Sequence, residues 1–192
     1  YWLGNGNSTD YEITVRDSDV EAVRAQIPYE IKSEVVQPGS RRLRIPALKP
    51  ILLDSFRDKV IPAEYLWASE GQRWALLQGL MDSDGCIGRE KSQSVYVSTI
   101  RQLAESVREL LWSLGVKNAM TVGPSLRYGE PTGETLYTIR FTTFDDQPTS
   151  RLKRKYDRRR ERTKKTRSCF HYLQDIQPLP YRVKMRCIQV DS

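Results

Sequence analysis

A repeated order of elements constrains the fold of this chain more than any other feature of its sequence. Hydrophobic periodicity predicts a helix, a strand, a helix, a pair of strands and a closing helix, and this order occurs twice. The two copies are related by a period of 79 residues, from Asn5 to Asp84. Two copies are too few for a solenoid, so the pattern predicts the duplication of one α+β unit.

The clearest predicted helix begins at Ser69. Ser69 and Gln72 form a capping-box pattern, in which each residue satisfies a free backbone N–H of the other. Gly85 is expected to end this helix. One face of it carries, at helical spacing, Trp74, Leu77, Leu80, Met81 and Asp84. Trp74 is expected in the core, together with Trp67 and Trp112.

The remaining elements follow from turn residues and alternating patterns. A helix is expected at 17–27, capped by Asp17 or Ser18 and stopped by Pro28, and a short helix at 51–56. A second amphipathic helix carries the leucines of 103–114, with Gly115 at its C-terminal cap. Strands are expected at 11–17, 29–36, 41–45, 95–98, 117–128 and 135–143, and the second and third are joined by a turn at Gln37-Pro38-Gly39-Ser40.

The positive charge of the chain is concentrated in one segment. The formal net charge is +7, from 31 basic and 24 acidic residues. The segment 151–167 holds 11 Lys and Arg against Asp157 and Glu161, a local charge of +9, so the rest of the chain carries −2. A basic block on a nearly neutral body favours a polyanionic partner such as nucleic acid; the alternative is a solvated tail.

Composition argues against several classes of protein. Hydrophobic residues make up 39% of the 192, and no apolar run reaches the ~18 residues of a membrane-spanning helix. The first residues lack the features of a signal peptide, and three cysteines argue against a disulfide scaffold. We therefore expect an intracellular, cytoplasmic protein, associated with the nucleoid in a prokaryote. Cys169 and His171 have no second ligand pair, which argues against zinc.

The segment 77–85, LQGLMDSDG, resembles the LAGLIDADG motif almost position by position, with departures at Gln78, Met81 and Ser83. The segment 1–6, YWLGNG, resembles the end of a first copy whose upstream half is absent. The spacing of the two copies is that of the two-motif, single-chain branch of the LAGLIDADG homing endonucleases.

Two further segments are similar to intein-borne members of this family. The segment 59–62, KVIP, resembles the Lys-x-Ile-Pro sequence before the second motif, and 185–192, MRCIQVDS, resembles the C-terminal conserved strand of an intein splicing domain. The resemblance implies an α+β fold of two pseudo-symmetric αββαββα subdomains that form a saddle-shaped β surface. The implied divisions are a first subdomain at 1–68 with an incomplete N-terminal helix, a second at 69–150, a basic DNA-contacting segment at 151–180, and the start of a splicing-domain strand at 181–192.

The resemblance also implies a metal-dependent cut in each DNA strand near the ends of the two motif helices. A carboxylate at each end suits Mg²⁺, a hard cation that prefers oxygen ligands. Asp84 is the carboxylate of the second copy, but Asn5 stands where the first copy calls for aspartate. Gly4 and Ser83 complete the expected metal-binding positions, and these small residues, with Gly79, permit close helix contact. Because Asn5 cannot supply negative charge, we predict weak or absent double-strand cleavage with DNA binding retained.

Lysines are the other expected catalytic groups. Lys59 matches the family lysine near the metal site, where its amine could polarise the attacking water or stabilise the phosphate. The second copy should supply a counterpart after its strand pair, and Lys153 and Lys155 both lie there. The sequence leaves the choice open, and Lys155 is taken as the candidate.

Strand residues are expected to read base edges in the DNA major groove, whose donor and acceptor pattern is distinct for each base pair. The alternative is the solvated face of a half-buried sheet. The candidates on the strands are Lys32, Arg41, Arg42, Arg44, Gln93, Tyr96, Arg127 and Arg140. In the basic block, the residues expected to contact phosphates are Arg151, Lys153, Arg154, Arg158 and Arg159.

The expected partner is double-stranded DNA at a long asymmetric site, in the host-gene allele that lacks the intein, bound by a monomer without membrane association. Two other functions stay open. Asn5 favours a DNA-binding module without nuclease activity. The segment 185–192 favours a self-splicing protein, but the chain shows no N-terminal Cys or Ser nucleophile segment and no C-terminal His-Asn pair, so it is not expected to splice as given.

Overall fold

The structure is a computed structural model that describes residues 1–7, 9–50, 58–88, 93–143, 147–158, 173 and 175–184. Several predictions lie outside the described residues. They concern the helix at 51–56, the splicing-like strand at 185–192, Cys169, His171 and Arg159.

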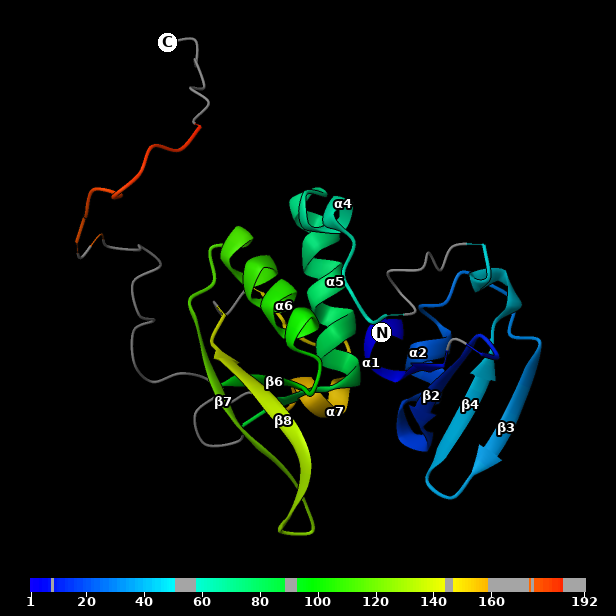
Figure 1. The fold of residues 1–192 in the computed structure, drawn as a ribbon. Helices are drawn as coiled ribbons and strands as arrows, with labels where there is room; N and C mark the ends of the chain where they lie inside the picture. The colour runs from blue at the N-terminus through cyan, green and yellow to red at the C-terminus, as the bar shows by residue number, and fades with distance from the viewer. Residues whose placement is uncertain are drawn as a thin grey trace.

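The first half of the chain folds around a four-stranded antiparallel sheet with the strand order β1-β2-β4-β3 (Figure 1). Its strands are β1 (Gly6–Asn7), β2 (Glu12–Arg16), β3 (Ser33–Gln37) and β4 (Ser40–Arg44). Its helical elements are α1 (Trp2–Asn5), the 3-10 turn η1 (Asp17–Asp19), α2 (Val20–Arg24) and the 3-10 turn η2 (Pro46–Leu48). All four strands are short, as expected for a small sheet with one helix-covered face.

The second half repeats this arrangement with longer elements. Its sheet has the strand order β5-β6-β8-β7, so its four strands are arranged in the same way as the four strands of the first sheet. The elements are α4 (Ala63–Leu66), α5 (Glu70–Ser83), β5 (Gly85–Ile87), β6 (Ser94–Ser98), α6 (Arg101–Ser113), β7 (Asn118–Arg127), β8 (Glu130–Phe141) and α7 (Lys153–Tyr156). The matching strand orders confirm the predicted duplication of one α+β unit.

Local signals in the sequence account for the boundaries of the main elements. The capping box of α5 is formed: Ser69 N donates to Gln72 Oε1 at 3.1 Å, and Gln72 N donates to Ser69 Oγ at 3.4 Å. At the end of α6, Gly115 has φ +70°, a conformation that suits glycine, and its N–H donates to the Trp112 carbonyl. Gly39, with φ +75°, turns the chain between β3 and β4 as predicted.

Two predicted elements differ from the structure in extent. The helix expected at 17–27 is only η1 and α2, and neither has a side-chain cap. The predicted caps are engaged elsewhere, because Asp17 binds Arg41 and Ser18 Oγ donates to Asp19 Oδ1. The last strand, expected at 135–143, begins at Glu130. With β7 it forms a long hairpin that extends well past the other strands of its sheet (Figure 1).

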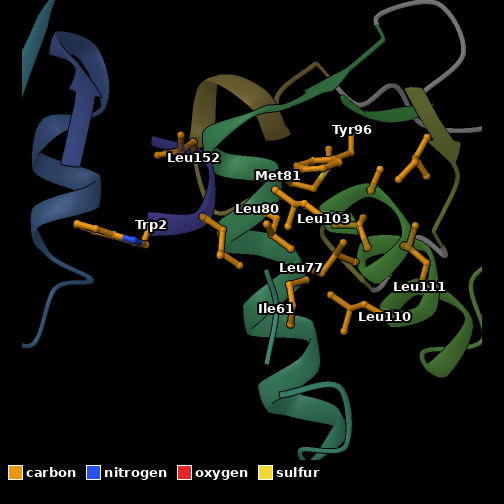
Figure 2. Packing of buried hydrophobic residues seen from close by; sticks show 14 of the residues in the cluster. Trp2, Ile61, Leu77, Leu80, Met81, Tyr96, Leu103, Leu110, Leu111 and Leu152 are labelled. Carbon is orange, nitrogen blue, oxygen red and sulfur yellow. The ribbon is translucent and has the colours of Figure 1, made fainter. Parts of the chain in front are cut away.

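The apolar core joins both halves in one cluster of buried residues. The predicted inner face of α5 is buried, with Leu77, Leu80 and Met81 each at 0% exposure, and the leucines of α6 pack against it (Figure 2). The predicted burial of two tryptophans is wrong. Trp67, after α4, is 82% exposed, and Trp112 is 49% exposed because it lies on the outer side of α6 beneath Arg108. No helix within the described ranges is long and apolar enough to span a membrane.

Candidate active site

The two halves meet where α1 contacts α5 (Figure 1). A Cβ added at Gly4 would lie 2.5 Å from Asp84 Oδ2 and 2.6 Å from Ser83 Cβ. A Cβ added at Gly79 would lie 2.7 Å from the backbone nitrogen of Tyr1. The predicted close contact between the two motif segments is therefore confirmed, and it depends on glycine at both positions.

Replacing Gly79 with alanine is expected to lower the free energy of unfolding by about 2 kcal/mol, because the added methyl group meets backbone across the contact. Gly71→Ala is the matched control in the same helix, where an added Cβ has nothing within 4 Å. That change should be neutral or stabilising by up to ~1 kcal/mol. Chemical denaturation of both variants measures the difference; equal stabilities would contradict the packing at Gly79.

Asp84 is the carboxylate at this junction, at the C-terminal cap of α5. Burial raises the pKa of its carboxyl group, and the ammonium groups of Lys155 and Lys59 act in the opposite direction. Asn5, the last residue of α1, donates from Nδ2 to Tyr1 Oη at 3.4 Å. One half thus supplies a carboxylate and the other an amide, and a lysine of each half acts on the same carboxylate.

Lys59 is bound to the first copy of the motif. Its Nζ donates to the carbonyls of Trp2 at 2.9 Å and Gly6 at 2.7 Å, and lies 5.6 Å from the centre of the Trp2 ring. Burial lowers the pKa of Lys59, while Asp84 opposes this shift. The position has a φ of +57°, an unusual conformation for a residue other than glycine.

Lys155 takes the corresponding place in the second copy. Its Nζ donates to the carbonyls of Met81 at 2.7 Å, Asp82 at 2.8 Å, Ser83 at 3.3 Å and Gly85 at 2.7 Å, and the residue is 5% exposed. Met81 and Gly85 lie 79 residues after Trp2 and Gly6, the two acceptors of Lys59. Lys153, the other candidate, points to solvent and pairs with Asp157. The structure therefore places Lys155, and not Lys153, as the spatial counterpart of Lys59.

The protonation of Lys155 should make stability depend on pH. Burial lowers the pKa of Lys155 from 10.5 to about 8. Between these values the unfolded chain binds this proton more often than the folded chain does, so this group makes stability rise with pH across the window. From pH 8 to pH 10, the free energy of unfolding is expected to increase more for the natural chain than for Lys155→Met, and chemical denaturation at the two pH values measures this. Identical pH slopes for the two proteins would contradict this.

Asp82 is a buried residue of the site that the sequence did not single out. Its Oδ1 accepts from Ser150 Oγ at 2.5 Å, Arg151 N at 3.0 Å and Leu152 N at 3.4 Å. These bonds fix the chain just before α7 and so hold Lys155 under the end of α5. The motif contains this aspartate, but its partners lie 68 to 70 residues away along the chain, beyond any local pattern.

The donor set limits the kind of metal site that these residues can form. Mg²⁺ is commonly held by one or two carboxylates together with water and substrate phosphates. Asp84 supplies one carboxylate and Asn5 one amide oxygen, while the predicted ligand Ser83 has its carbonyl engaged by Lys155. In the described ranges, no group of three or more His, Cys, Asp or Glu could hold a metal. Asp84 and Asn5 therefore fit a cation that also takes ligands from water and a substrate phosphate, and not one that the protein alone encloses.

The first sheet has one open face with positive charge. Successive strand residues point to opposite faces. Leu43 points into the core, so its neighbours Arg42 and Arg44 lie on the other face. Arg16 of β2, which is opposite Ser40, lies on that same face, and the sequence did not single it out. Arg42 lies 3.4 Å from Glu12. Lys32, next to the sheet, is exposed and donates its backbone N–H to Arg44 O.

Arg41 lies on the opposite, helix-covered face of that sheet. It binds Asp17 at 3.2 Å and Glu34 at 2.6 Å, and Glu34 also binds Arg24 of α2. These contacts lower the pKa of Glu34 and raise that of Arg41. The placement of Arg41 among the base-reading residues is therefore wrong, because alternation along β4 turns it away from Arg42 and Arg44.

The second sheet presents fewer charges on its open face. Arg140 is exposed there and donates to Thr121 Oγ1 at 2.9 Å, and Arg127 is exposed at the end of the long hairpin, beside Tyr128. Gln93 is half-buried just before β6. The prediction for Tyr96 is wrong: the residue is 0% exposed and packs in the core near Met81 (Figure 2). Its position on β6 turns the ring inward, and burial raises the pKa of its hydroxyl group.

The described part of the basic segment is closely attached to the fold. Arg154 Nε donates to both carboxylate oxygens of Asp19, at 2.8 and 2.7 Å, and Arg151 donates to Gln78 and Gln26. Lys153 and Arg158 are exposed. Of the predicted phosphate contacts, Arg151 and Arg154 thus already have protein partners.

Comparison with known proteins gives matches to one family model and one curated protein. Residues 71–147 match the model of the LAGLIDADG-like domain. A replicative DNA helicase, DnaB, from Mycobacterium intracellulare is 31% identical over 191 residues. The match covers 100% of this chain and 31% of the relative, so the chain spans less than a third of its length.

Solved structures of the homing endonuclease I-DmoI are similar at lower identity. One, with its target DNA in the presence of magnesium, gives a TM-score of 0.45 and 17% identity, covering 69% of this chain and 72% of that chain. Another, with its target DNA in the presence of manganese, gives a TM-score of 0.48 and 14% identity, covering 73% and 82%.

Proposed function

We propose that this chain is a DNA endonuclease domain of the homing type, which binds double-stranded DNA across its two sheets and is impaired in cleavage. The observation that carries the proposal is the junction of the two motif copies. There the Asp84 carboxylate meets the end of α1, and a lysine from each half, half-buried Lys59 and buried Lys155, is held at equivalent carbonyls. The LAGLIDADG-like match over 71–147 supports the same class of activity.

In this proposal the two sheets form a saddle on the DNA, and the junction faces the scissile phosphates. Asp84 and Asn5 would hold Mg²⁺ between them, and the bound cation would activate water and stabilise the leaving oxygen. Lys59 and Lys155 would each place an ammonium group near one phosphate and stabilise the charge that develops on it. The two I-DmoI structures with target DNA were obtained in the presence of magnesium or manganese.

The two half-sites are unequally equipped. Asp84 brings a charge to its side of the junction, and Asn5 brings none. We infer that metal affinity and cleavage are reduced for this reason, while the DNA-binding strands are unaffected. A DNA-binding module without cleavage is the alternative function, and the Asn5 amide is the observation that favours it.

We further propose that the chain is the endonuclease part of an intein in a DnaB-type helicase. The relative of that name aligns with all of this chain over 31% of its own length, and the segments 59–62 and 185–192 resemble intein-borne sequences. Its target would then be the helicase gene without the insertion, at the joined flanks. The chain would act as a monomer, since one chain supplies both halves of the site.

The open face of the first sheet provides a test of DNA binding. Arg42→Gln with Arg44→Gln should weaken binding to the joined-flank duplex and reduce the slope of log K against log salt by about 0.9 for each phosphate that the variant no longer neutralises. Arg101→Gln, which removes one exposed positive charge from α6, away from the first sheet, is the control and should leave the slope unchanged. Fluorescence anisotropy at several salt concentrations measures both; an unchanged slope in the double variant would remove this face from the interface.

A further inference from the structure

Residues 148–157, which we call the strap, are fixed to the second half of the protein along their length. Asp82 accepts three hydrogen bonds from Ser150, Arg151 and Leu152, and Lys155 is buried under the end of α5. Thr149 Oγ1 lies 3.0 Å from Ser94 Oγ in a buried pair. The strap is therefore a rigid extension of the second half.

From this base the strap reaches the first half through two arginines. Arg154 donates to both oxygens of Asp19, which is 4% exposed and lies at the start of α2. Arg151 Nη1 donates to Gln26 Oε1 at 3.2 Å, just after α2, while its Nε holds Gln78 of α5 at 2.7 Å. Both contacts join residues more than 120 positions apart in the chain.

The other described contact between the halves is that of α1 against α5, where Gly4 and Gly79 permit close approach. The pair of Arg154 and Asp19 adds a second point of attachment at the start of α2. Two separate points of attachment together oppose rotation of one half against the other.

We propose that Arg151 and Arg154 are positioning residues that lock the orientation of the two sheets and thereby set the separation of the two DNA half-sites that the protein accepts. This inference rests on the proposed function. It assigns to these arginines a role in protein geometry in place of the phosphate contact predicted from the sequence. A duplex advances 3.4 Å per base pair and also rotates, so a fixed orientation of the sheets selects one separation of half-sites.

The first test measures the orientation of the halves without DNA. The native cysteines are replaced by serine, and nitroxide labels are attached at Glu21→Cys in α2 and Glu109→Cys in α6. Double electron–electron resonance between the labels then measures the distance between the halves. Arg154→Gln and Asp19→Asn are each expected to broaden the distance distribution. Lys153→Gln is the matched control, because it removes the same charge from α7 at a residue that pairs with Asp157 within the strap. Exchange of the pair, Asp19→Arg with Arg154→Asp, should restore a narrow distribution.

The second test measures the DNA that is accepted. The chain and its variants are used to select from a library of joined-flank duplexes in which zero to three base pairs are added or removed at the centre. The natural chain and Lys153→Gln should prefer one separation by about tenfold. Arg154→Gln and Asp19→Asn should lose that preference while still binding.

The outcomes separate this inference from the proposed function. Distance distributions that stay narrow in Arg154→Gln and Asp19→Asn would overturn the strap. A preference for one separation that persists in these variants would overturn its role in DNA selection. If the distance distributions broaden in the variants but the natural chain selects no DNA, the strap's role in orienting the two halves is supported and the proposed DNA binding is contradicted.

Discussion

Lys155→Met is expected to lower the free energy of unfolding by about 2 to 4 kcal/mol and to abolish any cleavage activity. The ammonium group of Lys155 is the donor to four backbone carbonyls at the end of α5 and the start of β5. Methionine fills a similar volume but leaves these carbonyls without that donor in a buried place. The same change removes one of the positive charges that lower the pKa of Asp84.

Lys153→Met is the control for this prediction. Lys153 lies on the same helix two residues earlier, with its side chain 86% exposed, so its loss should change stability by less than about 0.5 kcal/mol. Urea denaturation of both variants and of the natural chain measures the effect. Equal stabilities for the two variants would show that the carbonyls find another donor, and would remove the structural basis for pairing Lys155 with Lys59.

Asn5→Asp is expected to tighten the binding of Mg²⁺ by about tenfold or more and to make stability depend on the metal. The new carboxylate would share the junction with Asp84, whose Oδ2 already lies against Gly4. Two like charges in one site repel each other, so without metal the variant should be less stable than the natural chain. With metal the repulsion becomes attraction to a common cation.

Thermal unfolding with Mg²⁺ and with EDTA measures this difference. The unfolding temperature of the natural chain should differ little between the two conditions, and that of Asn5→Asp should differ clearly more. Asn5→Asp combined with Asp84→Asn restores a single carboxylate and should return the shift to that of the natural chain. A large shift in the natural chain would mean that the amide is already an adequate ligand.

Much of the fold could be predicted from the sequence because its signals are local. The capping box at Ser69, the glycine after α6 and the turn at Gly39 each act within a few residues, and all three form as predicted. The duplication was visible because the same order of elements recurs. The close approach at Gly4 and Gly79 followed from small residues in the motif resemblance.

Prediction from the sequence failed where a residue distant along the chain determines a side chain's contacts or orientation. Asp17 or Ser18 was expected to cap a helix, but Asp17 binds Arg41 of β4, Ser18 donates to Asp19, and the helix is shorter. Tyr96 and Arg41 were expected on the DNA face, yet strand alternation, set by the register with the neighbouring strands, turns both away from it. The choice between Lys153 and Lys155 likewise needed the contacts with Met81 and Gly85.

The measurement that tests the central claim most directly is Mg²⁺-dependent cleavage of a joined-flank helicase duplex. The natural chain, Asn5→Asp, and Asn5→Asp with Asp84→Asn are compared at equal occupancy of the DNA. An endonuclease junction silenced at one ligand position predicts double-strand cleavage by Asn5→Asp, little or none by the natural chain, and none by the double variant. Tight binding by all three proteins with no cleavage by any of them would contradict it and leave a DNA-binding module.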